Sequence, residues 1–503
     1  MNRTVSLISD VPRQLSFLRR ESLCGWAMSA CVALMVSVMA AAPARAQSLT
    51  TIHSFNSTDG LGPNGLVQST DGNLYGTTSN GGANQSCILG GCGTAFKITT
   101  GGALTTLYNF CSKRNCSDGY DPGSALVQGG DGNFYGTASR GGILVGTVFK
   151  LTPAGVLTTL HQFNVTDGSY PNGIVEASDG NFYGTTSEGG GQGFGKIFKI
   201  THGGTFSNQH PFCSEPYCAD GGYPDGVLIQ ATDGNLYGTT TSGGAYDGGT
   251  VYKTTLAGTL TVVHNFCQQS GCTDGQVGAG VIQGVDGNFY GTTLFGGAYG
   301  FGTVFKLTPA GVLTTLYSFC AHSGCLDGNY PESQLLQATD GNLYGTTSSG
   351  GANDEGTVFK ITPSGSFKTL YSFCSESACT DGEVPYAPLI QDTNGMIYGT
   401  TGAGGTGASC GVGCGTVFSL NVGLPPFVKT EPTSGRVGVK IDILGTNLTG
   451  SASVTFNGTA ATFTVVSPSL ITATVPAGAT TGAVKVLTPG GTLKSNVPFR
   501  VIQ

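Results

Sequence analysis

The amino-acid sequence predicts an all-β protein, a seven-bladed β-propeller followed by an Ig-like β-sandwich. The 503 residues include 84 glycines, and only 10% are charged, a composition that excludes disordered polyelectrolytes and coiled coils. A pattern close to 54 residues long recurs along most of the chain, and such a period indicates a propeller, a solenoid or an array. Residues 425–503 lack this pattern and show turn signals every 8–12 residues, which is typical of a sandwich.

The repeat is marked by Asn-x-Tyr-Gly-Thr, which occurs six times and once more in the degenerate form Met-Ile-Tyr-Gly-Thr. Each repeat holds four runs that alternate apolar and polar residues; in the sixth they are residues 334–338, 342–347, 356–362 and 366–373. We name these strands A to D, from the ring axis outward. Seven sets of four short antiparallel strands predict a seven-bladed propeller. The repeat tyrosines are Tyr75, Tyr135, Tyr183, Tyr237, Tyr290, Tyr344 and Tyr398.

The two ends of the repeat region predict that the ring is closed. The seventh repeat stops after its strand C, residues 415–420, and the missing strand D precedes the first repeat at residues 49–55. We therefore predict that residues 49–55 form the outer strand of the last blade. A solenoid needs capping repeats instead of such a permutation.

The chain divides into four parts on this basis. Residues 1–46 combine arginines, an apolar run and Ala44-Arg45-Ala46, a small-x-small pattern, which predicts a signal peptide cut after Ala46. An N-terminal membrane anchor is the alternative, although the apolar run is short for a span. Residues 47–421 are the predicted propeller, 422–427 a linker and 428–503 the sandwich. We expect a secreted or cell-surface monomer with no membrane span after cleavage.

Charge argues against nucleic acid as a partner. Residues 1–46 contain five Arg and two acids, so the remainder has 17 basic (22 − 5) and 27 acidic (29 − 2) residues, a net charge of −10. Binding to phosphates needs a basic patch.

Fourteen cysteines follow residue 46, and they fall into seven pairs that are close in sequence. An even number of cysteines in an exported chain predicts disulfides, whereas zinc would need converging pairs or nearby His. The predicted pairs are Cys87 with Cys92, Cys111 with Cys116, Cys213 with Cys218, Cys267 with Cys272, Cys320 with Cys325, Cys374 with Cys379, and Cys410 with Cys414.

The recurring polar residues predict structural roles. The motif acids from Asp71 to Asp340 precede glycine in hairpins, and the strand C lysines from Lys97 to Lys360 are expected to pair with acids. His53, His161, His210 and His264 alternate with tyrosines at one position of strand D, which predicts a half-buried ring slot and no metal site. We expect no catalytic residue, cofactor or metal.

The units DGNLYGTT, GTVFKITP and LTTLYSF resemble the bacterial GloVer tandem repeat of choice-of-anchor surface proteins, over about residues 48–421. The C-terminal part resembles the IPT/TIG domain through Pro432-x-Ser434-Gly435, Gly445-Thr446-Asn447-Leu448 and Val475-Pro476. The first resemblance implies an exported protein with no transferable catalytic residues. The second implies a spacer or interaction module.

Loop lengths predict where a ligand binds. The A–B and C–D turns keep their length, whereas the B–C and D–A loops vary and contain all fourteen cysteines of the seven pairs. Antiparallel strands place the B–C and D–A loops on one face of the ring, and variable loops on a rigid scaffold are common binding sites. We therefore expect a binding or adhesion module for an extracellular polymer or protein. A secreted polysaccharide lyase or glycosidase and a purely structural envelope protein are the alternatives.

The two longest B–C loops, residues 80–92 and 402–414, belong to blades that ring closure makes neighbours. They predict a cleft beside the short loop 56–63, with the sandwich on the opposite face of the ring. The candidate ligand residues in this cleft are Asp59, Asn84, Gln85, Thr406 and Ser409.

Overall fold

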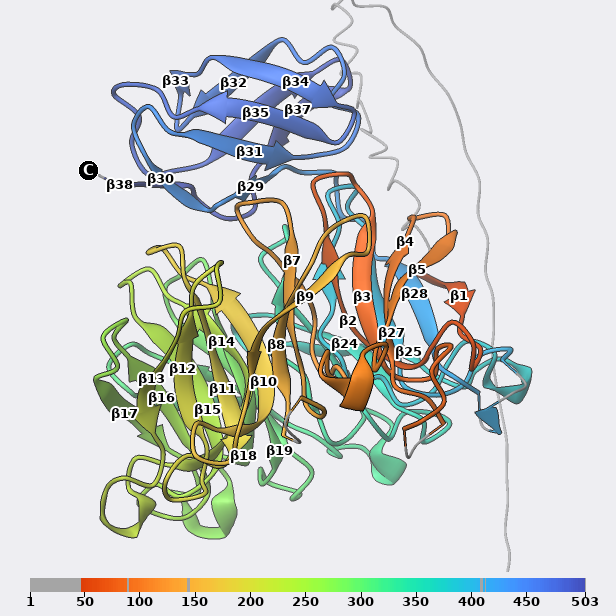
Figure 1. The fold of residues 1–503 in the computed structure, drawn as a ribbon, viewed down its shortest axis with the longest axis vertical. Helices are drawn as coiled ribbons and strands as arrows, with labels where there is room; N and C mark the ends of the chain where they lie inside the picture. Colours follow the sequence, from red (N-terminus) through yellow and green to blue (C-terminus); the bar gives the residue numbers. More distant parts are fainter. Residues whose placement is uncertain (1–46, 88–89, 143–144, 408–409, 412, 503) are drawn as a thin grey trace, which may run out of the picture. The chain divides into compact units, whose positions relative to one another are not determined.

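A computed structural model describes residues 47–87, 90–142, 145–407, 410–411 and 413–502. Seven four-stranded antiparallel sheets lie between Ser48 and Asn421, and they are the seven blades of a β-propeller (Figure 1). The described ranges contain no α-helix and five short 3-10 turns. None of their helical segments is long and apolar enough to cross a membrane. The predicted signal peptide lies outside the described residues.

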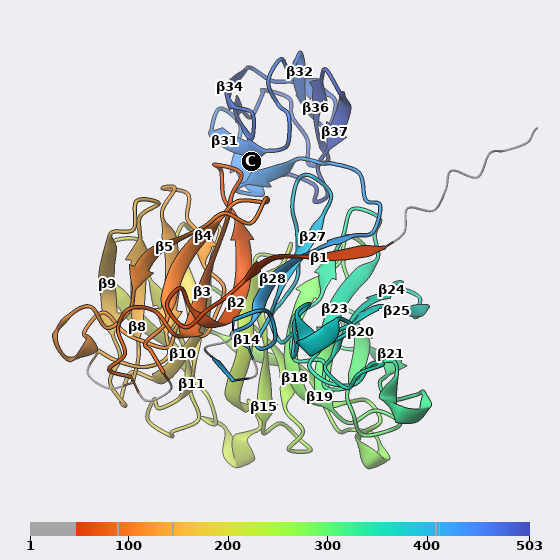
Figure 2. The ribbon, with the colours of Figure 1, turned by 90° about the vertical axis from the view of Figure 1, so that its right-hand side faces the viewer.

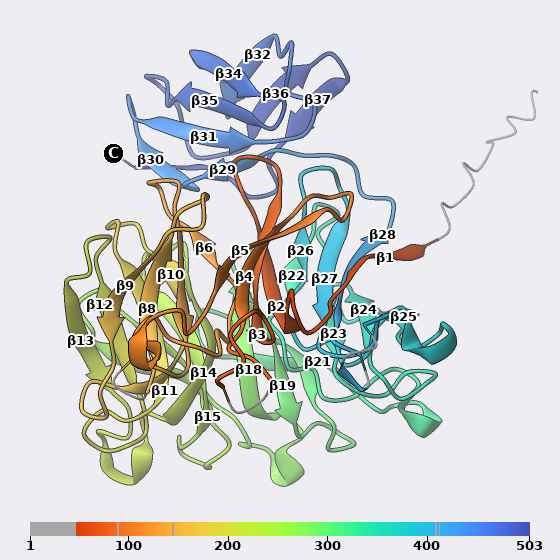
Figure 3. The same cartoon turned by 45° about the vertical axis from the view of Figure 1, so that its right-hand side comes forward.

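Each blade is a meander of strands A to D, and the inner strands β2, β6 and β10 of the first three blades can be followed in Figure 3. In chain order the blades are β2 (Leu61–Gln68), β3 (Leu74–Asn80), β4 (Thr94–Ile98) and β5 (Leu104–Asn109); β6 (Val127–Gln128), β7 (Phe134–Ala138), β8 (Thr147–Leu151) and β9 (Leu157–Gln162); β10 (Ser169–Glu176), β11 (Phe182–Glu188), β12 (Lys196–Ile200) and β13 (Phe206–Pro211); β14 (Gly222–Gln230), β15 (Leu236–Ser242), β16 (Thr250–Thr254) and β17 (Leu260–Asn265); β18 (Gln276–Gln283), β19 (Phe289–Phe295), β20 (Thr303–Leu307) and β21 (Leu313–Ser318); β22 (Leu336–Gln337), β23 (Leu343–Thr347), β24 (Thr357–Ile361) and β25 (Phe367–Ser372); and β26 (Ile390–Gln391), β27 (Ile397–Thr401), β28 (Thr416–Asn421) and β1 (Ser48–Ser54).

Aromatic contacts between neighbouring blades make the core. Tyr75 of strand B stacks on Phe134 of the next blade, with ring centroids 4.1 Å apart. Phe110, at the end of strand D, meets Phe149 of the next strand C edge-on at 5.1 Å. Similar pairs recur around the ring, so burial of repeat aromatics holds blade to blade.

The ring is closed as the sequence predicts. Strand β1 pairs antiparallel with β28, from Ser48 opposite Asn421 to Ser54 opposite Thr416 (Figure 2). Phe55, which follows β1, is fully buried and packs edge-on against Phe96 of blade 1 at 5.2 Å. The N-terminal strand therefore completes the last blade and contacts the first.

The C-terminal region is a β-sandwich with its own core. One sheet has the order β29-β31-β35-β34 and the other β33-β32-β36-β37, while β30 and β38 form a short parallel pair. Val454, Ile471 and Val486 are among the residues buried between the sheets. The strands are β29 (Lys429–Glu431), β30 (Ser434–Arg436), β31 (Lys440–Leu444), β32 (Ser453–Phe456), β33 (Thr459–Ala460), β34 (Phe463–Ser467), β35 (Leu470–Thr474), β36 (Val484–Thr488), β37 (Gly491–Lys494) and β38 (Arg500–Ile502).

Hydrogen bonds join this sandwich to A–B hairpins of the propeller within the single compact unit Arg45–Gln503. The Ser469 hydroxyl donates to the Thr70 carbonyl at 3.3 Å, and Arg500 donates to the Thr232 carbonyl at 3.0 Å. Just before β29, the Phe427 N–H donates to the Thr393 carbonyl. These contacts lie on the face opposite the cysteine loops, as the direction of strand C in blade 7 predicts.

Candidate functional site

The two faces of the propeller differ in how strictly they repeat. We call the side of the A–B and C–D turns the hairpin face, and the side of the B–C and D–A loops the loop face. On the hairpin face, the Asp71 carboxylate accepts hydrogen bonds from the Tyr75 hydroxyl at 2.9 Å and the Lys97 ammonium at 2.7 Å. The same ion pair recurs as Lys150–Asp131, Lys199–Asp179, Lys306–Asp286 and Lys360–Asp340. The predicted pairing is confirmed for five of the six strand C lysines and has a structural role, whereas the structure gives no ion pair for Lys253 among the described residues.

Blade 7 departs from this arrangement. Asn394 and Ser419 replace the aspartate and the lysine, and Asp392 occupies a position where the other blades carry Ala, Gly or Ser. Asp392 is 2% exposed, and its Oδ2 has no hydrogen-bond partner among the described residues. Burial raises the pKa of Asp392 to about 6, against the opposing effects of the Asn394 N–H and Lys429.

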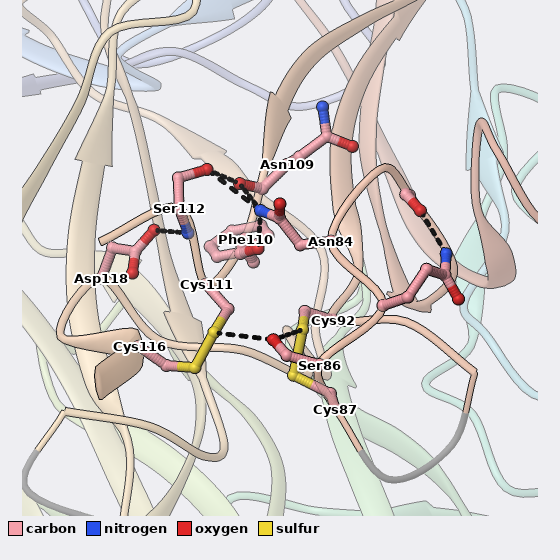
Figure 4. Close-up of a disulfide and its surroundings, with 12 residues drawn as sticks. Asn84, Ser86, Cys87, Cys92, Asn109, Phe110, Cys111, Ser112, Cys116 and Asp118 are labelled. Carbon is pink, nitrogen blue, oxygen red and sulfur yellow. Dashed lines mark hydrogen bonds between the residues drawn. A yellow bond between two sulfur atoms is a disulfide. The ribbon is translucent and has the colours of Figure 1, made fainter. Parts of the chain in front are cut away.

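On the loop face, each of the seven predicted cysteine pairs forms a disulfide within its own loop, and no bridge joins two blades among the described residues. Figure 4 shows two of the bridges, Cys87–Cys92 and Cys111–Cys116, on either side of Ser86. The other five join Cys213 and Cys218, Cys267 and Cys272, Cys320 and Cys325, Cys374 and Cys379, and Cys410 and Cys414.

The local structure around each bridge depends on the loop that holds it. Six bridges have a sequence separation of 5, and all of these except Cys87–Cys92 span a 3-10 turn that ends at the second cysteine, for example Arg114–Cys116. These five lie in D–A loops, and in them the second cysteine, as in Cys218 and Cys272, has a positive φ. The bridge that ends at Cys414 closes the long B–C loop of blade 7, where Cys414 is fully buried. The bridged sulfurs are not available as metal ligands.

The aspartate of each D–A loop fixes the loop through strand D. The Asp118 carboxylate accepts hydrogen bonds from the Tyr108 hydroxyl at 2.6 Å and the Ser112 N–H at 2.8 Å. Histidine takes the place of tyrosine in other blades, as in His161 and Asp167 at 3.2 Å. The ring slot that the sequence predicts is therefore a loop clamp.

Three of the five candidate ligand residues already have hydrogen-bond partners in their own loops or in or after a neighbouring strand. Asp59 accepts hydrogen bonds from the Asn56 N–H and side chain and contacts His53 at 3.2 Å. The Asn84 amide donates to the Phe110 carbonyl at 2.7 Å (Figure 4), and the Gln85 amide donates to the Gly82 carbonyl at 2.6 Å. Thr406 is exposed, and Ser409 lies outside the described residues. Ligand binding by these residues stays a prediction.

The loop face holds a ring of strained residues around the axis, which we call the rim. At the start of strand A, or a few residues before it, each blade has a residue with positive φ at the equivalent position: Gly62, Asp121, Tyr170, Tyr223, Val277, Tyr330 and Val384. For bulky residues this conformation costs roughly 1–2 kcal/mol each. An inter-blade hydrogen bond compensates, because every rim N–H donates to a carbonyl of the preceding B–C loop, as Tyr223 does to Phe194 at 2.9 Å.

Below the rim, strand A has two lengths when it is taken as the whole stretch from the rim to its recurring Gln or Glu, of which β6, β22 and β26 are only the regularly paired last two residues. Between the rim and the Gln or Glu that recurs in strand A there are five residues in blades 1, 3 and 5 but six in blades 2, 4, 6 and 7. At one level the longer strands bring Ala125, Val227, Gln334 and Pro388 to the axis, whereas the shorter ones have glycine. A Cβ on Gly173 would lie 2.5 Å from Val227 Cγ2, and one on Gly280 would lie 2.6 Å from Gln334 Cγ. The alternation of side chain and glycine fills the channel at this level.

Between this filled level of the channel and the rim lies an axial cavity of about 160 Å³, which we call the axial cup. Its floor includes Gln334, whose amide crosses to the carbonyls of Val227 at 2.7 Å and Val281 at 3.3 Å. Its walls differ from blade to blade: the extra residue of the longer strands is Gly123, Asp225, Glu332 or Tyr386. Asp225 and Glu332 are exposed to the cup, so solvent reaches it.

The cup is electronegative. Its lining contains two carboxylates, Asp225 and Glu332, and among the described residues that form it there is no Lys, Arg or His. Although Asp225 is exposed at the cup, the protein packed around it partly desolvates its carboxylate and raises its pKa; the carboxylate accepts one hydrogen bond, from the Gly226 N–H. Burial raises the pKa of Tyr386 to about 12, with Asp121 and Glu332 adding to the effect. Nearby in blade 7, burial and then the charge of Glu355 raise the pKa of Glu383.

The cup opens on the face where the sequence predicts a ligand, but none of the five predicted ligand residues lines it. The signal in the sequence that identifies the residues of the cup is the number of positions from the proline that follows the rim residue to the Gln of strand A. This separation is 6 positions in blade 4 (Pro224 to Gln230) and 5 positions in blade 1 (Pro63 to Gln68). The side chain at this additional position differs from blade to blade.

Solved structures support the fold. A fungal alcohol oxidase of the AA5 family, in complex with copper, is 15% identical, with a TM-score of 0.54 over 91% of this chain and 99% of the oxidase. A streptogramin B lyase is 16% identical, with a TM-score of 0.50 over 75% of this chain and 97% of the lyase. Virginiamycin B lyase from Staphylococcus aureus is 14% identical, with a TM-score of 0.50 over 75% and 99%. At these identities the likeness extends to the fold alone.

Curated proteins yield no match to this chain. The IPT/TIG domain matches residues 426–501. The Gloeobacter/Verrucomicrobia repeat matches residues 22–232, 145–335 and 225–430, which together cover most of the sequence. The chain therefore belongs to the Gloeobacter/Verrucomicrobia repeat family and ends in an IPT/TIG domain.

Proposed function

We propose that this protein is an exported interaction module that binds its partner at the axial cup. The repeat family, the IPT/TIG domain and the seven disulfides are consistent with an extracellular interaction protein. Residues 1–46 serve as the signal peptide in this proposal, 47–421 as the binding ring, 422–427 as the linker and 428–503 as the second module.

The observation that supports the cup is its asymmetry. On the hairpin face, equivalent positions in blades 1 to 6 carry the same side chains, and the same Tyr–Asp hydrogen bond recurs. In the cup, the equivalent position is a glycine in blade 2, a carboxylate in blades 4 and 6 and a tyrosine in blade 7. A concave, solvent-reached cavity with different polar groups is typical of a ligand site.

Gly123 offers a direct test. A Cβ on Gly123 meets nothing within 4 Å, and its φ is not positive. Gly123→Phe therefore places a ring in the cup without backbone strain, at the position where other blades already carry Asp, Glu or Tyr. Gly101→Phe is the matched control, since Gly101 is exposed in the C–D turn on the hairpin face.

The experiment is a binding screen of the purified chain against glycan and peptide arrays, repeated with both variants. We expect Gly123→Phe to weaken binding of the ligand found by about tenfold or more, because the ring fills most of the cavity. Gly101→Phe should bind as the wild type does. Equal binding by all three folded proteins would exclude the cup as the site.

An enzyme acting on polysaccharide is the alternative function, and the carboxylates Glu355 and Glu383 favour it. The raised pKa of Glu383 beside Glu355 is the kind of difference that separates a general acid from a base. The test is release of reducing or unsaturated ends from a polysaccharide panel by the wild type and Glu383→Gln. Activity lost in Glu383→Gln supports the enzyme, and an inactive wild type excludes it for those substrates.

A further inference from the structure

We propose that the axial cup binds a cationic side chain, the ammonium or guanidinium of a Lys or Arg in a partner polypeptide, between two Tyr-Pro-acid units. These units are Tyr223-Pro224-Asp225 in blade 4 and Tyr330-Pro331-Glu332 in blade 6. The inference rests on the proposed function and adds the chemical class of the ligand.

The two units are built alike and held rigidly. Each tyrosine lies on the rim with positive φ and donates its N–H to the preceding B–C loop, Tyr223 to Phe194 and Tyr330 to Phe301. Their rings also pack on those loops: Tyr223 lies 5.1 Å from Phe194, and Tyr330 lies 5.6 Å from Phe301. The inter-blade hydrogen bonds and the ring packing thus hold each tyrosine in place, and in each unit a carboxylate follows the tyrosine two positions later.

The space between the units is open. Blade 5, which lies between them, has the shorter strand A and contributes the small residue Ala279 to the lining of the cup. Among the described residues that line the cup, Tyr386 of blade 7 is the aromatic one, while Tyr223 and Tyr330 lie above it on the rim. A cavity of 160 Å³ is close to the roughly 150 Å³ that holds one benzene molecule, so the cup suits the end of one side chain.

The charges of the surrounding face favour a cation over a neutral or acidic ligand. The B–C and D–A loops of blades 4 to 7 contain no Lys or Arg. The same loops and the strand A starts carry the acids Asp225, Asp247, Glu332, Asp354, Glu355, Glu376 and Glu383. Carboxylates beside aromatic rings attract a cation both by ion pairing and through the ring faces.

The outer aromatic residues indicate that the cation belongs to a larger chain. Tyr246 and Tyr299, on the B–C loops of blades 4 and 5, are 50% and 52% exposed, and Phe295, at the end of β19, is 41% exposed. Exposed aromatic residues of this kind are enriched at protein interfaces. We therefore expect a basic segment that inserts one side chain and lies across these rings.

The test uses hexalysine peptide as the probe, with two other probes of defined chemistry. The second probe is the same peptide with every lysine Nε-acetylated, and the third is the neutral glycan cellohexaose. Affinity is measured by calorimetry on the purified full chain at two salt concentrations. We expect hexalysine to bind in a salt-dependent manner and the other two probes to bind at least tenfold more weakly.

Charge-neutral variants then locate the binding. Asp225→Asn/Glu332→Gln should weaken hexalysine binding by about tenfold or more, because it removes two charge-assisted contacts. Glu188→Gln/Glu215→Gln is the control, since it removes two exposed charges from the loop face outside the cup, and it should change the affinity less than twofold. Asp225→Asn alone should show an intermediate loss, and thermal unfolding verifies that each variant folds.

Three results would overturn the inference: no binding of hexalysine to the wild type, equal binding of hexalysine and its acetylated form, or an equal loss of affinity in both double variants. Binding of cellohexaose that Gly123→Phe abolishes would overturn the cationic ligand while leaving the proposed function intact. Binding of any probe that Gly123→Phe leaves unchanged would instead contradict the cup itself.

Discussion

The hairpin face and the loop face of the propeller are made by the same seven repeats, yet they differ in how their charges are satisfied. On the hairpin face the carboxylates are paired with tyrosine and lysine of their own blade, as Asp340 is with Tyr344 and Lys360. On the loop face the clamp aspartates are paired likewise, but Asp225 and Glu332 have no cation among the described residues that line the cup. The repeated, paired carboxylates stabilise the ring, whereas the carboxylates at positions that differ between blades have no paired cation in the described lining of the cup.

The largest effect should come from removing the strand that closes the ring. Deletion of residues 48–55 removes β1 and the buried Phe55, which leaves β28 as an exposed edge and Phe96 without its partner. Loss of one Phe core side chain alone costs about 3–5 kcal/mol, so we expect little folded protein. The measurement is thermal unfolding by circular dichroism.

Addition of a synthetic peptide of residues 48–55 should restore the folded signal, since an extended peptide can complete an exposed sheet edge. A deletion variant that unfolds like the wild type would show that blade 7 does not need this strand.

The next effect concerns Asp392, the buried carboxyl of blade 7. Its pKa is about 6 in the folded protein against 3.8 in the unfolded chain. A raised folded pKa means that the native state binds more protons, so stability falls as pH rises from about 4 to 6 and stays reduced above. Asp392→Asn lacks this titrating carboxyl. The free energy of unfolding of the variant, relative to that of the wild type, should therefore be higher at pH 8 than at pH 4 by up to about 3 kcal/mol.

Urea unfolding of both proteins at pH 4 and pH 8 measures this difference. Asp340→Asn serves as a control with an opposite sign, because the pKa of Asp340 is lowered and not raised. An Asp392→Asn protein with the pH profile of the wild type would contradict the assignment.

Removal of one disulfide should have a moderate and local effect. The bridge Cys320–Cys325 closes a loop with a sequence separation of 5, so Cys320→Ser/Cys325→Ser should lower the free energy of unfolding by about 2 kcal/mol. Urea unfolding gives the global value, and hydrogen exchange should show faster exchange in residues 319–328 only. Faster exchange in other blades would mean that the bridge supports the whole face.

The smallest effect should come from one ion pair of the hairpin face. Asp340→Asn keeps a hydrogen-bond acceptor for Tyr344 but loses the charge that pairs with Lys360 at 2.8 Å. Both side chains are partly exposed, so the loss should be about 1 kcal/mol or less. A loss above about 3 kcal/mol would show that these pairs are more than a repeated surface contact.

The ring, its closure and its two faces are predictable from sequence because each depends on local patterns. Alternation of apolar residues and the Asp340-Gly341 turn define the blades, and the absence of a strand D after Leu420 predicts β1. The cup depends on something that no local pattern shows, namely which strand A side chains from seven repeats meet on the axis. Asp59 and Asn84 look available in sequence because their partners, His53 and the Phe110 carbonyl, are brought to them only by the fold.

Closure by β1 also sets the order in which the chain acquires its structure. Ser54 pairs with Thr416, 362 positions later (416 − 54). Contacts so distant in sequence form late, because the intervening chain must first lose its conformational freedom. A chain delivered from its N-terminus presents β1 first and the strand that it pairs with last. The first strand of the ring therefore remains without its partner β28 until the other six blades have formed. Pairing of β1 with β28 is then the last step of folding, and this one step closes the whole ring.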